Sequence, residues 1–432
     1  MDFVPWKANR LTLRALLSVW VGLSLSCWRA RASVATAESS AQRKSAYNFS
    51  KPFLGLDKCN ACIGTSICKK FFKEEIRFEN WLSSNLKLPS SYKVSYAGNY
   101  TDDSNNWRVI VISRLLPQYK HDLSDTRICS SAHRSTCSIE SILKSTERFQ
   151  KWLGSNLLTP ELIQGLSSPM LRCPSQRLLN RIIRRYAEVA DAGSIQMNHF
   201  REQDKLRLLY TLSINQHPII LQIFPGKEGW PFPRYHGSCG RMMVTAGTEP
   251  LRKYYGAPLE TVADLAYQLL RITEFLRENG LSYLLYYTTI SADMFGTFED
   301  GRLFITDAST IGVIDKQEGY PLEGRHREQQ DIFSCLSLDC RPFPSCQSVR
   351  EAQSLLLLCK EILPKLLLSR QRTNLHLHKE MKMLLHDCSA ATLSDKSIIH
   401  AAKELMHLLK PFRPCTQRFP YRYPECKYNT DY

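Results

Sequence analysis

Apolar residues recur at helical spacing in the middle of this chain. In residues 175–190 the apolar positions lie three or four residues apart, and three arginines share another face (Arg177, Arg181 and Arg184). The segment is therefore a predicted helix. We expect its basic face to be solvated rather than to form a binding site.

A second helix is predicted over residues 262–279, where a run of apolar residues forms one stripe. Thr261 followed by Asp264 resembles a capping box, and Gly280 stands where a C-terminal cap would. This pattern is typical of a helix packed into a core.

Strands are predicted directly after this helix. Residues 281–287 form an apolar and aromatic run, and two short apolar segments, 295–298 and 303–306, flank the pair Asp300-Gly301. Because an Asp-Gly pair suits a tight turn, the two segments are predicted to form a hairpin. Asp307 emerges at the end of its second strand.

The N-terminus predicts a secretory signal peptide. Basic residues precede an apolar run from Ala15 to about Cys27, and residues 30–32 offer small side chains around a cleavage point. The run is shorter than the roughly 20 residues of a membrane-spanning helix. We therefore expect residues 1–32 to be removed, leaving no transmembrane segment. The apolar stretch 353–368 contains Lys360, Glu361 and Pro364 and is predicted to be a core helix.

Composition divides the rest of the chain. Residues 33–50 are small and polar, which is typical of a flexible leader, and residues 51–172 form a mixed, cysteine-containing region. A second region, 173–432, opens at Cys173-Pro174 and ends in a cysteine-containing tail. With 43% hydrophobic residues among 432, the chain can bury a sizeable core.

Cysteine usage indicates an oxidising compartment. Of the 15 cysteines, Cys27 lies in the predicted signal peptide, which leaves an even number in the mature chain. Disulfides are expected rather than a zinc site, because no second cysteine pair at zinc spacing follows the first cluster. The disulfide candidates are Cys59, Cys62, Cys68, Cys129, Cys137, Cys173, Cys239, Cys335, Cys340, Cys346, Cys359, Cys388, Cys415 and Cys426.

Two sequons for N-linked glycosylation, at Asn48 and Asn99, agree with that compartment and suit exposed loops. Residues 429–432 do not match a luminal retention signal. We therefore expect passage through the endoplasmic reticulum and Golgi, followed by secretion.

The formal net charge of +16 predicts a basic surface. We expect no nucleic-acid partner, because the chain shows no aromatic-interleaved basic stripe and its compartment argues against one. An acidic glycan or a cell-surface receptor would suit such a surface. A solvated basic face without a ligand is the alternative.

Four segments together resemble the divergent protein kinase domain family, and within it the secreted, deleted-in-autism-related branch. They are residues 59–68 (CNACIGTSIC), 226–241 (GKEGWPFPRYHGSCGR), 307–316 (DASTIGVIDK) and 421–429 (YRYPECKYN). The resemblance covers nearly the whole mature chain. It implies an α+β, kinase-like bilobal fold with an N-terminal disulfide-rich extension, stapled by several disulfides.

The resemblance allows the catalytic positions to be compared one at a time. Active kinases bind magnesium with the Asp of a D-F-G triplet, and Asp307 occupies that place, followed by Ala308 and Ser309. The Asn of the catalytic loop corresponds to Met294, whose thioether is a poor magnesium ligand. The catalytic Asp corresponds to Thr289, which has no carboxylate.

Some assignments stay open. Asp293 lies next to the Asn position and could bind metal, but no acid in residues 281–292 could act as the base. Asp307 could instead cap the turn after its strand. Residues 219–224 could form the strand that carries the nucleotide-binding Lys. Gln222 would then stand near the place of that Lys as a candidate substitution. Alternatively residues 205–214 end a helix, and the Lys and its Glu partner lie further upstream.

Two functions follow from these comparisons. The first is a secreted pseudokinase that acts as a binding or signalling module, with a cell-surface receptor as its partner. The second is a divergent active kinase that phosphorylates luminal proteins or glycans, using ATP with Mg²⁺ or Mn²⁺. Thr289 and Met294 favour the first function.

Overall fold

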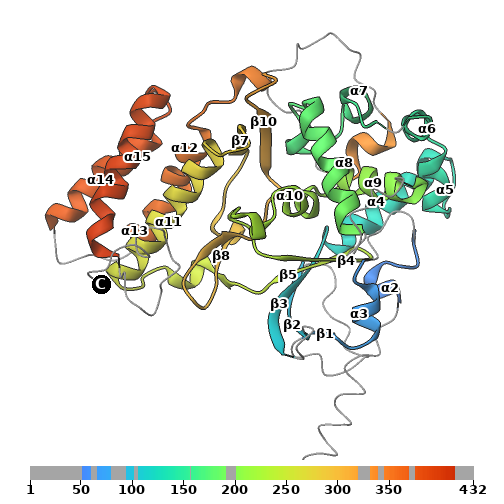
Figure 1. Ribbon diagram of the computed structural model, residues 1–432, viewed down its shortest axis with the longest axis horizontal. Helices are drawn as coiled ribbons and strands as arrows, with labels where there is room; N and C mark the ends of the chain where they lie inside the picture. Colours follow the sequence, from blue (N-terminus) through green and yellow to red (C-terminus); the bar gives the residue numbers. More distant parts are fainter. Residues whose placement is uncertain are drawn as a thin grey trace, which may run out of the picture. The chain divides into compact units, whose positions relative to one another are not determined.

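A five-stranded antiparallel sheet opens the fold, with its strands in the order β1-β2-β3-β5-β4. Figure 1 shows these strands in the computed structural model. They are β1 (Ile76–Phe78), β2 (Ser95–Thr101), β3 (Trp107–Arg114), β4 (Tyr235–Cys239) and β5 (Met242–Ala246). Ile112 of β3 pairs with Val244 of β5. The sheet therefore combines strands from both sides of Cys173.

The structure describes residues 51–59, 66–78, 94–101, 106–155, 157–190, 201–319, 331–338, 345–368 and 375–413. All of them belong to one unit, formed by Lys51–Glu79 and Pro89–Tyr432. The predicted signal peptide and leader, Asn48, Cys62, Cys340, Cys415 and Cys426 lie outside the described residues.

Helices precede the sheet and connect β3 to β4. They are α2 (Lys51–Leu54), α3 (Cys68–Phe72), α4 (Gln118–Ser131), α5 (Ile139–Lys144), α6 (Glu147–Leu153), α7 (Pro160–Ile163), α8 (Gln176–Ala190), α9 (Glu202–Ile214) and α10 (His217–Ile223). The helix predicted over residues 175–190 is confirmed as α8. The prediction that its arginine face is merely solvated is wrong, because Arg177 forms an ion pair with Asp315 at 2.6 Å and Arg181 with Glu228 at 3.7 Å.

The second predicted helix is confirmed as α11 (Leu259–Arg277), but its predicted caps are wrong. The helix begins after Pro258 without a side-chain cap, and its C-cap is Glu278 rather than Gly280. Asp264 lies on the buried face with 2% of its surface exposed and accepts a hydrogen bond from Arg413 Nε at 3.0 Å. The Asp264 carboxylate therefore binds Arg413, which is distant in the sequence, and does not cap the helix.

The strands expected after α11 are confirmed. β7 (Tyr283–Tyr287) is buried along its whole length and pairs antiparallel with β10 (Ile311–Asp315). β8 (Phe295–Thr297) and β9 (Leu303–Ile305) form the predicted hairpin, and β8 also pairs with β6 (Glu249–Pro250). Gly301 has a φ of +81°, which its lack of a Cβ permits in this turn.

The C-terminal part is helical. Its helices are α12 (Gln353–Glu361), α13 (Leu363–Leu367), α14 (Leu375–Ser389) and α15 (Asp395–Leu409). α14 packs against α15 and α12, and Figure 1 shows α14 and α15 side by side. The core helix predicted over residues 353–368 is present as two buried helices, α12 and α13. Within the described ranges, no helix combines the length and the apolar character needed to cross a bilayer.

Disulfides are present, as predicted, and two of those described link distant parts of the chain. The bonds are Cys68–Cys239, Cys129–Cys137, Cys173–Cys346 and Cys359–Cys388. Cys59 and Cys335 are also disulfide-bonded. Cys68–Cys239 ties α3 to the end of β4, and Cys173–Cys346 joins residues near β7 and β10 in a small buried cluster.

Asn99 lies in β2, between Arg77 of β1 and Val109 of β3. The expectation that this sequon occupies an exposed loop is therefore wrong. The alternation of polar and apolar residues in 95–101 is a strand pattern, with Tyr96 and Gly98 buried on the opposite face.

Asp315 ends β10 as a buried carboxylate with many donors. It accepts hydrogen bonds from Ser175 Oγ at 2.8 Å, from Arg177 Nε at 2.7 Å and Nη2 at 2.6 Å, and from Gln317 N at 2.9 Å. Its side chain has no exposed surface, whereas 30% of the Arg177 side chain is exposed. Asp315 therefore fastens the first turn of α8 to the β7–β10 ribbon.

Candidate functional site

The loops that follow β7 and β9 meet beside Asp307. Thr310 Oγ1 donates to Thr289 O at 2.9 Å, and Met294 O accepts a hydrogen bond from Thr306 N at 2.8 Å. The three positions singled out in the sequence, Thr289, Met294 and Asp307, are therefore brought close together by hydrogen bonds between their loops.

Asp307 uses one carboxylate oxygen to hold its own turn. Oδ1 accepts a hydrogen bond from Ser309 N at 2.8 Å, which is an Asx turn. The capping role that the sequence left open is thus present. Any metal bound by Asp307 would have to coexist with this turn.

Two buried rings lie close to Asp307. His217 Nδ1 accepts a hydrogen bond from Ala308 N at 3.0 Å. Burial lowers the pKa of His217 although the Asp307 charge opposes it, so the imidazole is neutral, with its proton assigned to Nε2. Burial, and then the Asp307 charge, raise the pKa of Tyr287 well above its usual value. The hydrogen bond to Nδ1 thus ties His217 to the turn that follows Asp307.

Gln216 fixes the backbone that follows Asp307. Its side chain is 2% exposed, and Nε2 donates to Ala308 O at 3.1 Å and to Ile311 O at 2.6 Å. Its Oε1 accepts from Ser168 Oγ at 2.6 Å and from Met170 N at 2.7 Å. One amide thus uses its donors and its acceptor to join the α9–α10 junction, the turn at Pro169–Leu171 and the Asp307 loop.

The side chains of Thr289, Asp293 and Met294 differ in their contacts. Met294 Sδ lies 3.6 Å from Thr310 Oγ1, and Thr289 is exposed. Asp293 pairs with Arg252 at 2.5 Å, and both side chains are mostly exposed. Among the described residues, no three His, Cys, Asp or Glu side chains lie together as a metal site would require. A kinase holds its two magnesium ions with one Asp and one Asn, and beside Asp307 this structure has the thioether of Met294, whose O atom accepts from Asp307 N at 3.4 Å.

Gln222 lies in helix α10, so the prediction that residues 219–224 form a strand is wrong and the alternative helical reading of 205–214 is confirmed as the end of α9. Pro218 stands in the first turn of α10, where its fixed φ suits a helix start. A short apolar run does not distinguish a buried strand from a buried helix. Gln222 therefore loses the strand position on which its cofactor-binding assignment depended.

Sequence reasoning missed the strand that precedes α4. β3 ends in Arg114, which is buried and donates to Phe53 O at 3.2 Å and Gln118 Oε1 at 2.9 Å. The continuous β-branched run of residues 109–112 was the available signal. The buried amine of Lys205 likewise holds main-chain atoms in place. Its Nζ atom donates to Trp152 O at 2.8 Å and to Ser155 O at 2.6 Å at the end of α6.

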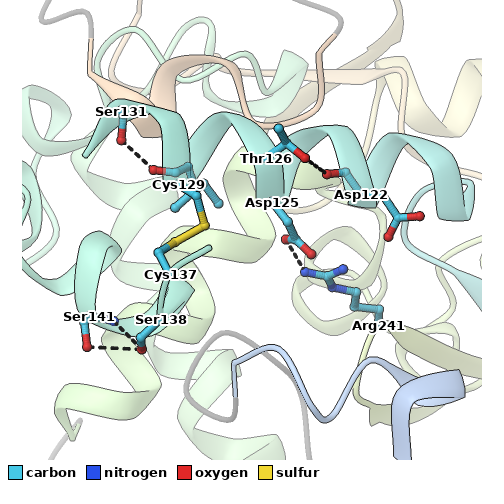
Figure 2. Close-up of a disulfide and its surroundings, with 10 residues drawn as sticks. Asp122, Asp125, Thr126, Cys129, Ser131, Cys137, Ser138, Ser141 and Arg241 are labelled. Carbon is cyan, nitrogen blue, oxygen red and sulfur yellow. Dashed lines mark hydrogen bonds and ion pairs between the residues drawn. A yellow bond between two sulfur atoms is a disulfide. The ribbon is translucent and has the colours of Figure 1, made fainter. Parts of the chain in front are cut away.

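An ion pair joins α4 to the sheet. Figure 2 shows Asp125 of α4 pointing at Arg241, and the Asp125 Oδ1 to Arg241 Nη2 distance is 2.5 Å. Arg241 lies in the turn between β4 and β5, with 2% of its side chain exposed. The Cys129–Cys137 disulfide in the same view ties the end of α4 to the segment that precedes α5. The helix that follows β3 is thus held to the β4–β5 turn.

Comparisons with known proteins match both the site and the rest of the chain. Residues 209–391, which include Thr289, Met294 and Asp307, match the family described as the protein-kinase domain of FAM69. The human protein divergent protein kinase domain 2B is 55% identical over 96% of this chain and 95% of its own length.

More distant relatives match part of the chain. Divergent protein kinase domain 2A of Xenopus tropicalis is 39% identical over 61% of this chain and 62% of its own length. A solved structure, Rv3197 from Mycobacterium tuberculosis in complex with erythromycin, covers 92% of this chain and 93% of that chain at 12% identity, with a TM-score of 0.30.

Proposed function

Because this chain belongs to the divergent protein kinase domain family, we propose that it is a secreted pseudokinase that acts as a binding or signalling module at the cell surface. A single observation carries the proposal. The loops that carry Thr289 and Met294 lie beside Asp307, and the resemblance to kinases aligns these two residues with the catalytic Asp and the second metal ligand.

Phosphoryl transfer depends on positioned charges, so the loss of these groups removes most of the rate enhancement. Thr289 cannot accept a proton as a carboxylate can. Met294 is held next to Thr310 and offers a soft sulfur in place of a hard oxygen ligand. What remains is a stable surface, which suits recognition better than catalysis.

Two features support secretion. The disulfides among the described residues are typical of an oxidising compartment. Removal of residues 1–32, which hold five Lys or Arg and one Asp, lowers the formal net charge from +16 to about +12. This basic charge suits acidic partners on a cell surface, of which a receptor is the candidate that fits signalling and an acidic glycan the other.

The test measures thermal unfolding of the purified, secreted full chain with ATP plus Mg²⁺ or Mn²⁺. We expect no nucleotide-metal mixture to raise the melting temperature of the wild type or of Asp307→Asn. Binding to the folded protein would raise the melting temperature by mass action, so the absence of a rise means the absence of binding. The double variant Thr289→Asp/Met294→Asn restores the kinase residues, so it is the one in which a metal-dependent rise could appear. Asp300→Asn, in the hairpin turn, controls for the loss of a nearby carboxylate.

A metal-dependent rise in the wild type that Asp307→Asn abolishes and Asp300→Asn retains would contradict this expectation. It would favour the active-kinase alternative, and the next measurement would be transfer of labelled phosphate to luminal proteins.

A further inference from the structure

The sheet carries an exposed apolar face on β2 and β3. Successive side chains of a strand point to opposite faces, so Ala97, Asn99 and Thr101 share one face with Trp107 and Val109. Trp107 is 45% exposed and Val109 is 59% exposed. Single exposed apolar residues are common, whereas neighbouring ones that form a contiguous patch mark a surface that another group can cover.

The register places the Asn99 sequon in the middle of this face. Asn99 is directly opposite Val109, and Thr101, the third residue of the sequon, is directly opposite Trp107. Trp107 is diagonal to Asn99, which is within reach of a large side chain or its attachments. On the other side of Asn99, Arg77 extends its guanidinium to 4.3 Å from the centre of the Trp107 ring.

The face continues toward the candidate functional site. Val109 O accepts a hydrogen bond from Gly247 N at 2.9 Å. The next residue, Thr248, touches Gly296, which in turn lies against Thr306. Thr306 directly precedes Asp307, so a series of neighbouring residues connects Val109 with this site.

We infer that an N-linked glycan on Asn99 is the occupant of this face, and that its first sugar packs over Val109 and Trp107. N-acetylglucosamine has an apolar face of C–H groups that can cover an indole and a valine, and polar hydroxyls that then meet water. The glycan makes an apolar sheet face soluble and keeps protein partners away from it.

The glycan is transferred from a lipid-linked oligosaccharide donor. The Asn99 Nδ2 atom forms a bond to C1 of an oligosaccharide carried on a lipid pyrophosphate, the C1–O bond to the pyrophosphate breaks, and the amide loses a proton. Addition takes place in the secretory pathway, so this inference rests on the secretion proposed above.

The experiment compares Thr101→Ser, which keeps the sequon, with Thr101→Ala and Asn99→Gln, which remove it. Each full chain is purified from the medium of a eukaryotic secretory host, and the Asn48 and Asn99 peptides are measured by mass spectrometry. We expect the Asn99 glycan in the wild type and Thr101→Ser, and its loss in both sequon-removing variants.

Covering of the face is read separately by hydroxyl-radical labelling of the Trp107 peptide. Labelling should increase in Thr101→Ala and Asn99→Gln relative to Thr101→Ser. Enzymatic trimming of the wild-type glycan to its first sugar should keep the protection, because that sugar is the one in contact.

Several results would overturn the inference. An unmodified Asn99 beside a modified Asn48 would overturn it while leaving secretion standing. Equal Trp107 labelling in Thr101→Ser and Thr101→Ala would show that the glycan does not cover the face. If the chain is absent from the medium and the chain recovered from the cells retains residues 1–32 with neither Asn modified, the secretion proposal fails, and this inference fails with it.

Discussion

Replacing Asp315 with Ala is expected to lower the free energy of unfolding by about 3–5 kcal/mol, the usual effect of breaking a buried ion pair. Asp315 has no exposed side-chain surface and accepts hydrogen bonds from Ser175, Arg177 and Gln317. Its removal leaves the Ser175 hydroxyl and a main-chain N–H without their acceptor. The readout is the midpoint of urea unfolding, with an unchanged slope indicating that stability alone has changed.

The same carboxylate should make stability depend on pH. Burial would raise the pKa of Asp315, but the Arg177 ion pair and the Ser175 and main-chain hydrogen bonds hold it below the ordinary value of 3.8. Its contribution is therefore present above pH 3.8 and is lost as the pH falls through the lower folded value. Below that range the wild type and Asp315→Asn should converge in stability.

A matched control is available on the surface. Glu249→Gln removes the ion pair to Lys253, in which both side chains are more than half exposed, so the urea midpoint should not change measurably. If Asp315→Ala behaved like Glu249→Gln, Asp315 would not be the fastening point between α8 and β10.

Gln216→Leu is expected to cost about 3 kcal/mol or more, because a buried group left without its partner loses about 1–3 kcal/mol. The variant keeps a similar side-chain size but leaves Ser168 Oγ and Met170 N without their acceptor and removes the side-chain donor from Ala308 O and Ile311 O. Urea unfolding measures the loss. Hydrogen exchange should also quicken at residues 308–311, because the turn after Asp307 loses its brace.

Gln150→Leu is the control for this second change. Gln150 is exposed and donates a single hydrogen bond, to Lys144 O at 2.7 Å. We expect a change below about 1 kcal/mol and no effect on exchange at residues 308–311. Equal effects of the two leucine substitutions would contradict the role assigned to Gln216.

The sequence predicts the local parts of this fold well. The helix α11, the strand β7 and the β8–β9 hairpin follow from apolar spacing and from one Asp-Gly turn, which are signals contained in short stretches of chain. Asp307 could be placed for the same reason, since it directly follows the hairpin.

The rest depends on contacts between distant residues. Asp264 looked like a helix cap but pairs with Arg413, and the arginines of α8 looked solvated but pair with Asp315 and Glu228. No periodicity reveals such partners. Gln216 and His217 were missed because their importance lies in the Asp307 loop, which is remote from them in sequence.

The two long disulfides also bear on how the chain is made. Cys68 and Cys239 are 171 residues apart, and Cys173 and Cys346 are 173 apart. At a synthesis rate of about 5–20 residues per second, each first cysteine waits roughly 10–30 s on the nascent chain before its partner leaves the ribosome. Cys129 and Cys137 are 8 residues apart and emerge from the ribosome while Cys68 waits for Cys239. Cys68 can therefore form an incorrect disulfide with either of them.

The two long loops overlap, because Cys173 lies between Cys68 and Cys239, so neither bond can secure the complete fold alone. The yield of correctly paired protein should therefore depend on a disulfide isomerase more than on the rate of oxidation.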